Sequence, residues 1–467
     1  MSSLGLVIRI AWRNLGRNRR RTLITGAGIA LGAAMCIGAI GILDGLDLQI
    51  VHSITDGELG HIQVHAPDYM RSRKLADAFD PTQALPALDH ADHVVGVAPR
   101  VYGWGFAAKD TQSSGVQLMG VDPQREVAVT SLLPTGSALP VQPTPWKQAR
   151  ALTAEQKAQD EALTKAATDA AISEIDALAP ATDKPAATNA ETRALLAQVA
   201  PRPDAPLPAL VGAGLARKLH VRTGDTFSVI SQDVDGVQVD VDVRVVGTLH
   251  TSSDALDRTR VVMNWRDLQR MLGLGERVHE IALRVDQPGD ATDLAAALHA
   301  KLPKLDVESW TQLRPDAVAI VGANDALSAT LVFLIFLVSA LGVTNTMLMS
   351  IFERKRELGV LKAVGMRPAM LVAMVVAETV LLAAVAASAG LIGGWALDEV
   401  LLHVGLHTSQ AAFSLAGANV QPVLHAAITV KGLLMPVGAL IGMAFVASLY
   451  PAFSAARVQP AVGMRDL

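Results

Sequence analysis

Four long apolar stretches restrict the fold of this chain more than any other feature of its sequence. They lie at residues 22–43, 326–352, 369–402 and 431–454. The first carries no charge, and the apolar run from Ala369 to Leu397 carries only Glu378. About 20 apolar residues cover the hydrocarbon core of a bilayer, and uncharged runs of this length are rare in water-soluble proteins. The sequence therefore predicts an integral membrane protein with four transmembrane helices.

Basic residues are distributed unevenly around these stretches. Residues 1–21 hold six arginines and no acidic residue, and 353–368 hold five lysines and arginines, whereas 403–430 hold none. Because positive residues accumulate on the cytoplasmic side of a membrane, we expect the N-terminus, the loop 353–368 and the tail 455–467 to be cytoplasmic. The segments 44–325 and 403–430 are then expected in the periplasm, with the chain in a bacterial inner membrane.

The N-terminal segment 1–21 has the pattern of an amphipathic helix that lies on the membrane surface. Its apolar residues recur at helical spacing, and its arginines occupy the other face. Trp12 is expected at the depth of the lipid headgroups, with Arg13 and Arg17 on lipid phosphates. Membrane lipid is therefore an expected partner of this helix.

The large segment 44–325 is predicted to form an α+β domain inserted between the first and second membrane helices. Short runs of β-formers bounded by Gly and Pro predict strands, at 60–66, 93–108, 114–122, 225–231, 237–249, 259–264 and 279–285. Helices are expected at 209–219, 265–274 and 290–302. The one cysteine, Cys36, lies in the first apolar stretch. The domain must therefore be stabilised by core packing without disulfides.

Residues 134–208 interrupt this pattern. Prolines mark both ends of the segment, and an Ala-rich, charged stretch lies between them. This composition favours a helix, but its apolar stripe is thin. We expect a mobile helical insertion rather than a part of the core.

The sequence holds no motif of catalysis and no strong metal site. It contains no Gly-Lys pair, which excludes a phosphate-binding loop of the GxxxxGK[ST] type, and neither GxSxG nor HExxH occurs. His403 and His407 could share a helix face, but two ligands make a weak metal site. We therefore expect no catalytic residue, no bound metal or cofactor, and no nucleic-acid partner.

Two features inside the apolar stretches each have two interpretations. Glu378 is a functional candidate because intramembrane carboxylates are costly, but a structural hydrogen bond or a position near the headgroups fits equally well. Pairs of glycines four residues apart let helices approach closely, although glycine is also simply common in membrane helices. The pairs are Gly28 and Gly32, Gly390 and Gly394, and Gly438 and Gly442.

The loop 353–368 reads ERKRELGVLKAVGMRP. It resembles the cytoplasmic loop of the FtsX/MacB/LolCE superfamily of ABC transporter permeases (type VII), which reads E-R-x-x-E-[IL]-G-[VI]-x-[RK]-A-x-G. The C-terminal stretch YPAFSAARVQPAVGMR is similar to the ending of that family. Four further segments resemble its lipoprotein-releasing LolC/LolE branch, namely GHIQVHAPDY, APRVYGWG, LMGVDPQRE and GAGLARKLHVRTGDTFSV. Residues 140–208 have no counterpart in the family.

The segment from Arg354 to Val364 is expected to form a short helix. Leu358, Leu361 and Val364 would form an apolar edge, with charged side chains in water. A loop of this kind could serve only to fix topology, but the resemblance implies that it docks on an ATPase. The residues assigned to this contact are Glu353, Arg354, Glu357, Leu358, Gly359, Leu361, Lys362, Ala363 and Gly365.

The resemblance implies a permease subunit rather than an enzyme. Two permeases, identical or different, would work with two copies of a separate cytoplasmic ATPase, which would carry the ATP and Mg. Hydrolysis would move the periplasmic domains, a process called mechanotransmission. The expected cargo is a lipoprotein or another lipid-anchored molecule, with a periplasmic chaperone or adaptor as a candidate partner. The alternatives are a MacB-type efflux permease with an adaptor, and an FtsX-like regulator of a periplasmic hydrolase.

Overall fold

The computed structural model divides into two compact units. The membrane unit consists of Met1–Ser53 with Arg314–Leu467, and the α+β unit consists of Ile54–Leu313. Within the described residues, four helices are long and apolar enough to cross a membrane. The residues that the structure describes are 9–14, 16, 19–134, 136–147, 202–251, 253–407, 413–415, 418–420 and 423–457.

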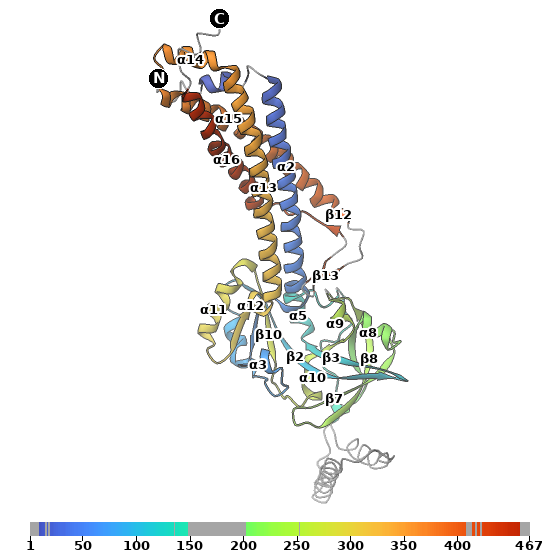
Figure 1. Ribbon diagram of the computed structural model, residues 1–467. Coiled ribbons are helices and arrows are strands. Elements are labelled where there is room, and N and C mark those ends of the chain that lie inside the picture. The colour runs from blue at the N-terminus through green and yellow to red at the C-terminus, as the bar shows by residue number, and fades with distance from the viewer. Residues whose placement is uncertain are drawn as a thin grey trace, which may run out of the picture. The chain divides into compact units, whose positions relative to one another are not determined.

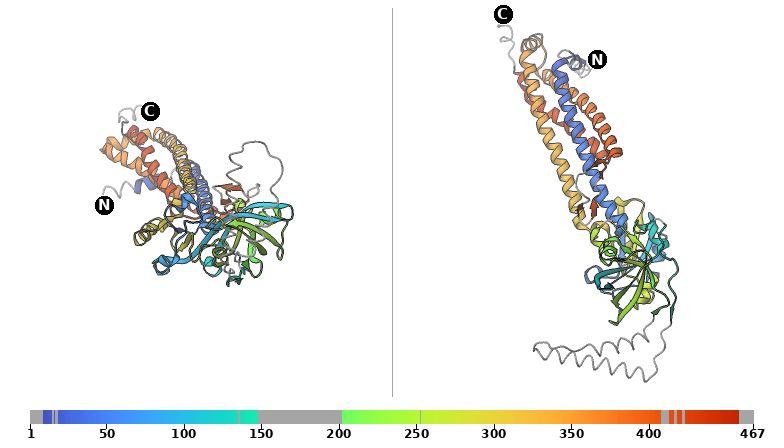
Figure 2. Two further views of the ribbon diagram at one scale, coloured as in Figure 1. Left: turned by 90° about the horizontal axis from the view of Figure 1, so that it is seen from below. Right: turned by 90° about the vertical axis from the view of Figure 1, so that its right-hand side faces the viewer.

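The membrane unit is built on four long helices. They are α2 (Arg19–Ile54), α13 (Pro315–Glu353), α15 (Pro368–Val404) and α16 (Val430–Ala456). Each contains one of the predicted apolar stretches and extends beyond it at both ends, and all four run side by side (Figures 1 and 2). Both α13 and α15 begin with proline at the first helical position, where no backbone N–H is needed. The Thr429 side chain caps α16 by accepting a hydrogen bond from the Gly432 N–H.

Glycines allow α15 to approach α2 closely. A Cβ atom on Gly390 would lie 2.5 Å from Cβ of Ala33, and one on Gly394 would lie 2.7 Å from Cβ of Ile37. These two glycines therefore serve helix packing, as the sequence predicts. The other two predicted pairs face no neighbouring helix within the described residues, since nothing lies within 4 Å of a Cβ built on Gly28, Gly32, Gly438 or Gly442.

Glu378 is not the only buried carboxylate in α15. Asp398 lies inside the predicted stretch 369–402, just after the apolar run that ends at Leu397. It is 2% exposed and lies directly over Gly41 of α2. The connection after α15 contains two short antiparallel pairs, β12 (Leu406–His407) with β15 (Val423–Leu424) and β13 (Phe413–Leu415) with β14 (Ala418–Val420). His403 lies in α15 and His407 in β12, so no single helix face holds both.

The α+β unit contains a nine-stranded sheet with strand order β11-β1-β10-β2-β3-β9-β6-β8-β7. The sequence order of its strands is β1 (Ile62–His65), β2 (Val94–Lys109), β3 (Gln112–Val121), β6 (Leu207–Gly212), β7 (Thr226–Gln232), β8 (Gln238–Leu249), β9 (Arg260–Asn264), β10 (Glu280–Val285) and β11 (Asp306–Ser309). One edge of β2 pairs first with β10 and then, at Gly105–Ala108, with β7. This second pairing closes β2, β3, β9, β6, β8 and β7 into a six-stranded barrel, with β10, β1 and β11 as a flanking sheet.

Alternation along the strands fills the interior of this barrel. Val241, Val243 and Val245 of β8 are almost fully buried, whereas the side chains between them are exposed. A second apolar cluster, which includes Tyr102 and Met119, covers part of the outer face. Successive side chains of a strand point to opposite faces, so β2 and β3 contribute to both clusters.

Short helices complete the α+β unit. They are α3 (Tyr69–Ser72), α4 (Leu85–Leu88), α5 (Pro123–Val129), α8 (Ala213–Lys218), α9 (Asp254–Asp257), α10 (Trp265–Met271), α11 (Ala291–Lys301) and α12 (Trp310–Leu313), with 3-10 turns at Pro81–Gln83 and Pro288–Asp290 and a π-helical turn, η1, at Thr55–Leu59. All seven predicted strands are present, and the predicted helices 265–274 and 290–302 correspond to α10 and α11. The chain is therefore an α-helical membrane protein with a large α+β domain between its first and second long helices.

The predicted helix 209–219 is wrong in its first half. Residues Leu207–Gly212 form β6, which pairs with β8 on one side and β9 on the other, and only Ala213–Lys218 are helical. Every residue of β6 is buried. A strand covered on both faces is continuously apolar and lacks the alternation that would distinguish it from a helix.

The predicted mobile insertion 134–208 is wrong at both ends. Leu139 is buried in the second apolar cluster, and the carbonyls of Pro140 and Val141 accept hydrogen bonds from the Asn264 amide. β4 (Trp146–Lys147) pairs with β5 (Arg202–Pro203), so the two ends of the insertion meet. Two of the prolines in this region, Pro203 and Pro208, lie within the strands β5 and β6. The rest of the insertion, 148–201, lies outside the described residues.

Candidate functional site

A short helix between α13 and α15 carries most of the residues that are predicted to contact the ATPase. It is α14 (Lys355–Ala363). Arg354 separates it from α13, with φ −102° and ψ 12°. At its end Gly365 has φ +100°, and the Met366 N–H bonds to the Leu361 carbonyl. That left-handed position favours glycine, and it turns the chain so that α15 can begin at Pro368.

One face of α14 is fixed to the ends of the long helices. Leu358 is 2% exposed and packs in a cluster with Ile351, Leu371 and Ala452. Nζ of Lys362 donates a hydrogen bond of 2.8 Å to the Ala456 carbonyl at the end of α16. A cation at a helix C-terminus also interacts favourably with the helix dipole. These contacts join α14 to α13, α15 and α16.

Arg354 connects α14 to the interior of the membrane unit. Its Nη1 lies 3.2 Å from Oε2 of Glu378, and its Nε donates to Oε2 of Glu357 at 3.4 Å. Glu378, 8% exposed, also accepts a hydrogen bond of 3.3 Å from Nδ2 of Asn14. Nη2 of Arg21 lies 3.0 Å from Oε2 of Glu353. The structure therefore brings together Glu353, Arg354, Glu357 and Glu378 around one polar cavity, and adds Asn14 and Arg21.

The exposed face of α14 differs from the predicted apolar edge. Leu358 is buried, Leu361 is half-buried, and only Val364 of the predicted three is exposed. Val360 is 48% exposed and Val364 83% exposed, and Arg356 and Ala363 lie on the same open face. Helical spacing identifies an apolar stripe on a helix, but it does not show which side of that helix packs against the rest of the chain.

The N-terminal helix is described in part. Residues 9–14 are helical, with Trp12 61% exposed, Arg13 exposed and Ala11 fully buried. One apolar side chain thus faces the unit and one faces outward, as an interfacial helix requires. Arg17 lies outside the described residues.

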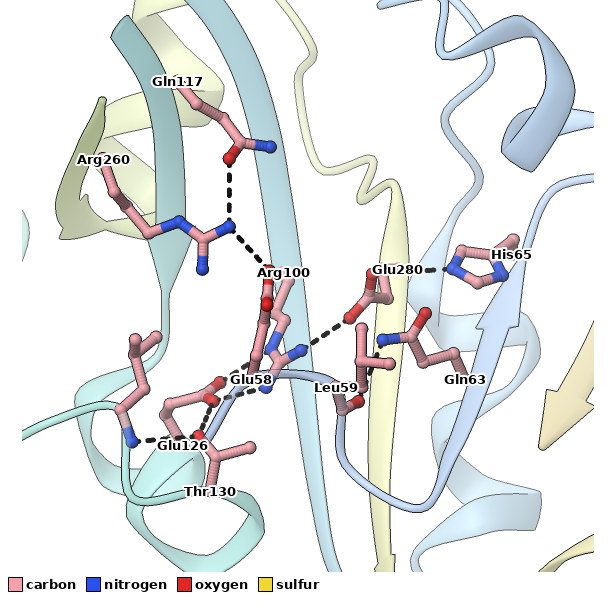
Figure 3. A network of polar contacts seen from close by, with 11 residues as sticks. Glu58, Leu59, Gln63, His65, Arg100, Gln117, Glu126, Thr130, Arg260 and Glu280 are labelled. Atoms are coloured by element: carbon pink, nitrogen blue, oxygen red, sulfur yellow. Dashed lines mark hydrogen bonds and ion pairs between the residues drawn. The ribbon is translucent and has the colours of Figure 1, made fainter. Parts of the chain in front are cut away.

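The α+β unit contains a second polar network, buried in its core (Figure 3). Arg100, fully buried on β2, donates from Nε and Nη2 to both oxygens of Glu126 and from Nη1 to Oε1 of Glu280 at 2.7 Å. Nε2 of His65 lies 3.5 Å from Oε2 of Glu280. Burial opposes the charge of Glu280, but Arg100 and His65 outweigh it and lower the pKa of Glu280 to about 2. The network joins β1, β2, α5 and β10.

The first turn after α2 is also tied to the sheet by charges. Glu58 of η1 lies 2.8 Å from Nη2 of Arg260 on β9, and that nitrogen also donates to Gln117 of β3 (Figure 3). Asp56 lies 3.6 Å from Arg284 of β10. None of these residues is among the predicted site residues. The available signal was Arg100, Arg260 and Glu280 at positions where a predicted strand is otherwise apolar.

Two family sequence models match the chain. The FtsX-like permease C-terminal domain matches residues 329–460, and the MacB-like periplasmic core domain matches residues 22–174. The chain is therefore similar to permeases of the FtsX, MacB and LolC type. The FtsX-like match contains α14 and Glu378, whereas Asn14 and Arg21, which also line the polar cavity, lie outside both matches. The MacB-like match contains the strand that carries Arg100.

Curated relatives of the chain agree with these matches. The lipoprotein-releasing system transmembrane protein LolC of Xylella fastidiosa (strain Temecula1) is 25% identical over 269 residues, which are 55% of this chain and 64% of the relative. LolC of Neisseria meningitidis is 24% identical over similar shares. The macrolide export ATP-binding/permease protein MacB of Vibrio parahaemolyticus is 27% identical over 230 residues, 47% of this chain and 32% of the relative. The chain thus spans less than two thirds of the LolC proteins that it matches.

Two solved structures are similar to about half of this chain. The periplasmic region of MacB from Actinobacillus actinomycetemcomitans matches 54% of this chain and 90% of that structure, at 14% identity and a TM-score of 0.27. The extracellular domain of the transporter YknZ matches 53% of this chain and 99% of that structure, at 11% identity and the same TM-score.

Proposed function

We propose that this chain is the permease subunit of an ABC transporter, in which α14 receives the motion of a separate cytoplasmic ATPase. The observation that carries the proposal is the structure of α14: one face is fixed to three long helices, and the opposite face is exposed. A surface helix with one anchored side and one open side is suited to bind a partner and to transmit its displacement.

The contacts of α14 define how a displacement would spread. Leu358 and Lys362 connect it to the ends of α15 and α16, and Arg354 connects it to Glu378 within α15. A push on α14 would therefore move the ends of α13, α15 and α16 together. The long helices would carry that movement to the extracytoplasmic domain, without a path for cargo through the membrane.

The exposed face of α14 also indicates the chemistry of its partner. Val360, Ala363 and Val364 offer a small apolar patch, and Arg356 and Arg367 lie beside it. A groove with an apolar floor and acidic side chains at its edge would complement this face. ATP and Mg would be bound by the partner, since the chain has no phosphate-binding loop. We propose two permeases and two ATPase chains in the complex.

We further propose that the cargo is a lipoprotein or another lipid-anchored molecule. The similarity to two LolC proteins, whose name states lipoprotein release, supports this cargo. The similarity to MacB favours efflux as the second candidate, with a periplasmic adaptor. An FtsX-like regulator of a periplasmic hydrolase is the third. Identification of the proteins and lipids that co-purify with the chain would distinguish a lipoprotein, an adaptor and a hydrolase.

The proposed topology places both termini and α14 in the cytoplasm of a bacterial cell and the α+β unit in the periplasm. The absence of Lys and Arg from 403–430 and their density in 353–368 support it. Cysteine labelling would test the topology. A single cysteine at Lys355 should react with an impermeant reagent only after the cells are opened, and one at Lys301 should react in cells with a permeable outer membrane.

The docking proposal is tested by Val360→Asp. The charge should weaken recovery of the ATPase in a pull-down at least about tenfold, because a buried unpaired carboxylate in an interface costs more than the roughly 1.4 kcal/mol of that factor. Val127→Asp, at a 58% exposed valine of α5, is the matched control and should leave recovery unchanged. Full recovery with Val360→Asp, or equal loss with both variants, would refute docking at this face.

A further inference from the structure

A basic pocket lies on the α+β unit, away from the polar networks described above. Its polar lining consists of Arg217, His220, Arg222, Thr223, Thr248 and His250, over a floor that includes Ala213, Ala216 and Val221. Most of these residues belong to the segment GAGLARKLHVRTGDTFSV, for which the proposed coupling function gives no role. The pocket has a volume of about 600 Å³, which is enough for a small ligand.

The helix α8 and the end of strand β8 bring these side chains together. Ala213, Ala216, Arg217 and His220 follow each other at helical spacing along α8 and its end, so they share one face. Thr248 lies near the end of β8 and His250 lies one residue beyond it, and both line the pocket. Because β6 leads directly into α8 and pairs with β8 in parallel, α8 and the end of β8 lie side by side (Figure 1).

The backbone conformation at the end of α8 places the following residues in the pocket. His220 has φ +52°, in the left-handed region, and the Val221 N–H bonds to the Ala216 carbonyl at 3.0 Å. Glycine usually occupies this position of a helix end. A histidine here costs backbone strain, and such strain is characteristic of positions where the side chain has a use. The turn returns Arg222 and Thr223 to the same depression as Arg217.

The charge of the pocket is only partly compensated, by Asp225, which lies outside the lining and interacts electrostatically with Arg222. The side chains of Arg217, His220, Arg222 and His250 are exposed and make no ion pair or hydrogen bond with another described residue, and no acidic side chain is among the lining residues. The nearest carboxylate in sequence, Asp225, is already engaged by Nζ of Lys109 and the Arg222 N–H, each at 3.0 Å. Asp257, on the neighbouring α9, accepts from the Thr251 N–H.

We propose that this pocket binds a phosphoryl group, carried either by a lipid headgroup or by a small soluble phosphoester. Two guanidinium groups can each offer paired N–H donors to phosphate oxygens. The hydroxyls of Thr223 and Thr248 supply neutral donors, and the imidazoles add donors at the rim. A tetrahedral oxyanion accepts from several directions at once, which suits donors that come from two separate elements.

Binding of inorganic phosphate to the full-length protein in detergent tests this site. Titration calorimetry at constant ionic strength should show saturable binding of phosphate and of glycerol 3-phosphate at millimolar concentrations. The double variant Arg217→Gln with Arg222→Gln should weaken it at least about tenfold, because both charge-assisted contacts are lost. Arg71→Gln, which removes an arginine that is 88% exposed outside the pocket, should bind like the original protein.

The same experiment distinguishes the two sources of the phosphoryl group. Binding of short-chain phosphatidic acid at least about tenfold tighter than glycerol 3-phosphate, with the difference lost in the double variant, would assign a lipid headgroup. Equal binding of the two would assign a soluble phosphoester. The proposal is overturned if none of the three compounds shows saturable binding, or if the double variant, folded by circular dichroism, binds as tightly as the Arg71→Gln control.

Discussion

At the scale of single residues, Arg354 and Glu378 form an ion pair that accounts for the burial of both side chains. A carboxylate within an apolar helix is costly when it has no partner, and an arginine where two helices meet needs an acceptor. The structure pairs them at 3.2 Å, with Asn14 as a second donor to the carboxylate. Of the two interpretations that the sequence leaves open for Glu378, these contacts favour a structural role, one that also links α15 to the start of α14.

Removing Glu378 tests this pairing. In a double-mutant cycle, Arg354→Gln and Glu378→Gln should show a coupling free energy of about 1–3 kcal/mol in thermal unfolding, because both side chains are largely buried. The more exposed pair of Arg314 and Asp316 is the control and should show under about 1 kcal/mol. A coupling at Arg354 no larger than that of the control would contradict the assigned link.

His279 makes a second residue-scale prediction, which concerns acid stability. Its Nδ1 accepts from the Tyr102 N–H at 3.1 Å and its Nε2 lies 3.0 Å from the Leu75 carbonyl. Burial lowers the pKa of His279 to about 4, below the ordinary 6.5. The unfolded chain therefore binds the extra proton first, and stability should fall as pH drops from 6.5 towards 4, by about 3 kcal/mol.

Glu280 acts over a different pH window. Its pKa is lowered to about 2 from 4.5, so its contribution is complete above pH 4.5 and is lost as pH falls towards 2. Denaturant unfolding of the full-length protein at a series of pH values would measure both effects. His279→Gln should be less stable at pH 7 but lose little more between pH 6.5 and 4.5. An unchanged slope in that variant would show that another group is responsible.

At the scale of elements, α14 shows that neighbouring positions of one helix can have different roles. Leu358 is 2% exposed and Val360 is 48% exposed, although both are aliphatic and two residues apart. The first holds the helix to α13, α15 and α16, and the second is available to a partner. The motif by which the loop resembles its family mixes both kinds of residue.

Alanine substitutions at these two positions should therefore have different effects. Leu358→Ala should destabilise the anchoring of α14 by about 2–5 kcal/mol and make the bonds after Lys355 and Arg356 more susceptible to trypsin. Val360→Ala should leave tryptic cleavage unchanged and should weaken only ATPase recovery. Equal cleavage of both variants would mean that Leu358 does not hold the helix in place.

At the scale of the whole molecule, each unit has its own means of cohesion. The membrane unit relies on glycine-mediated helix contacts and on the polar cavity around Arg354. The α+β unit closes a barrel and buries Arg100 between two carboxylates contributed by α5 and β10. Arg100 also lies on β2 where its pairing with β10 ends and its pairing with β3 begins.

Arg100→Gln should destabilise the α+β unit as a whole. It leaves Glu126 and Glu280 buried without their cation, which costs about 3–5 kcal/mol. Arg125→Gln, which breaks an exposed pair with Asp89, should cost under about 1 kcal/mol. Differential scanning calorimetry should show the effect in the transition of the α+β unit. A shift no larger than that of the control would show that the buried network contributes little.

The sequence was informative wherever the information is local. Apolar length gave the four long helices, alternation gave seven strands, and the loop motif located α14. Contacts between distant residues could not be predicted from the sequence. Arg100 and Glu280, for example, are 180 positions apart and become neighbours only in the folded sheet. The strand β6 could not be predicted either, because its residues are all buried and show no apolar-polar alternation. The burial of Leu358 depends on residues of α13, α15 and α16, which are distant in the sequence.

The double pairing of β2 has a consequence for the dynamics of the α+β unit. Along its length, this one strand is hydrogen-bonded to β10, β3 and β7. The barrel cannot open, nor can the flanking sheet detach, without breaking bonds of β2. Its amides from Arg100 to Ala108 should therefore exchange with deuterium among the slowest in the unit, at the rate of global unfolding. A domain built in this way would respond to applied force as a single rigid body rather than deform strand by strand.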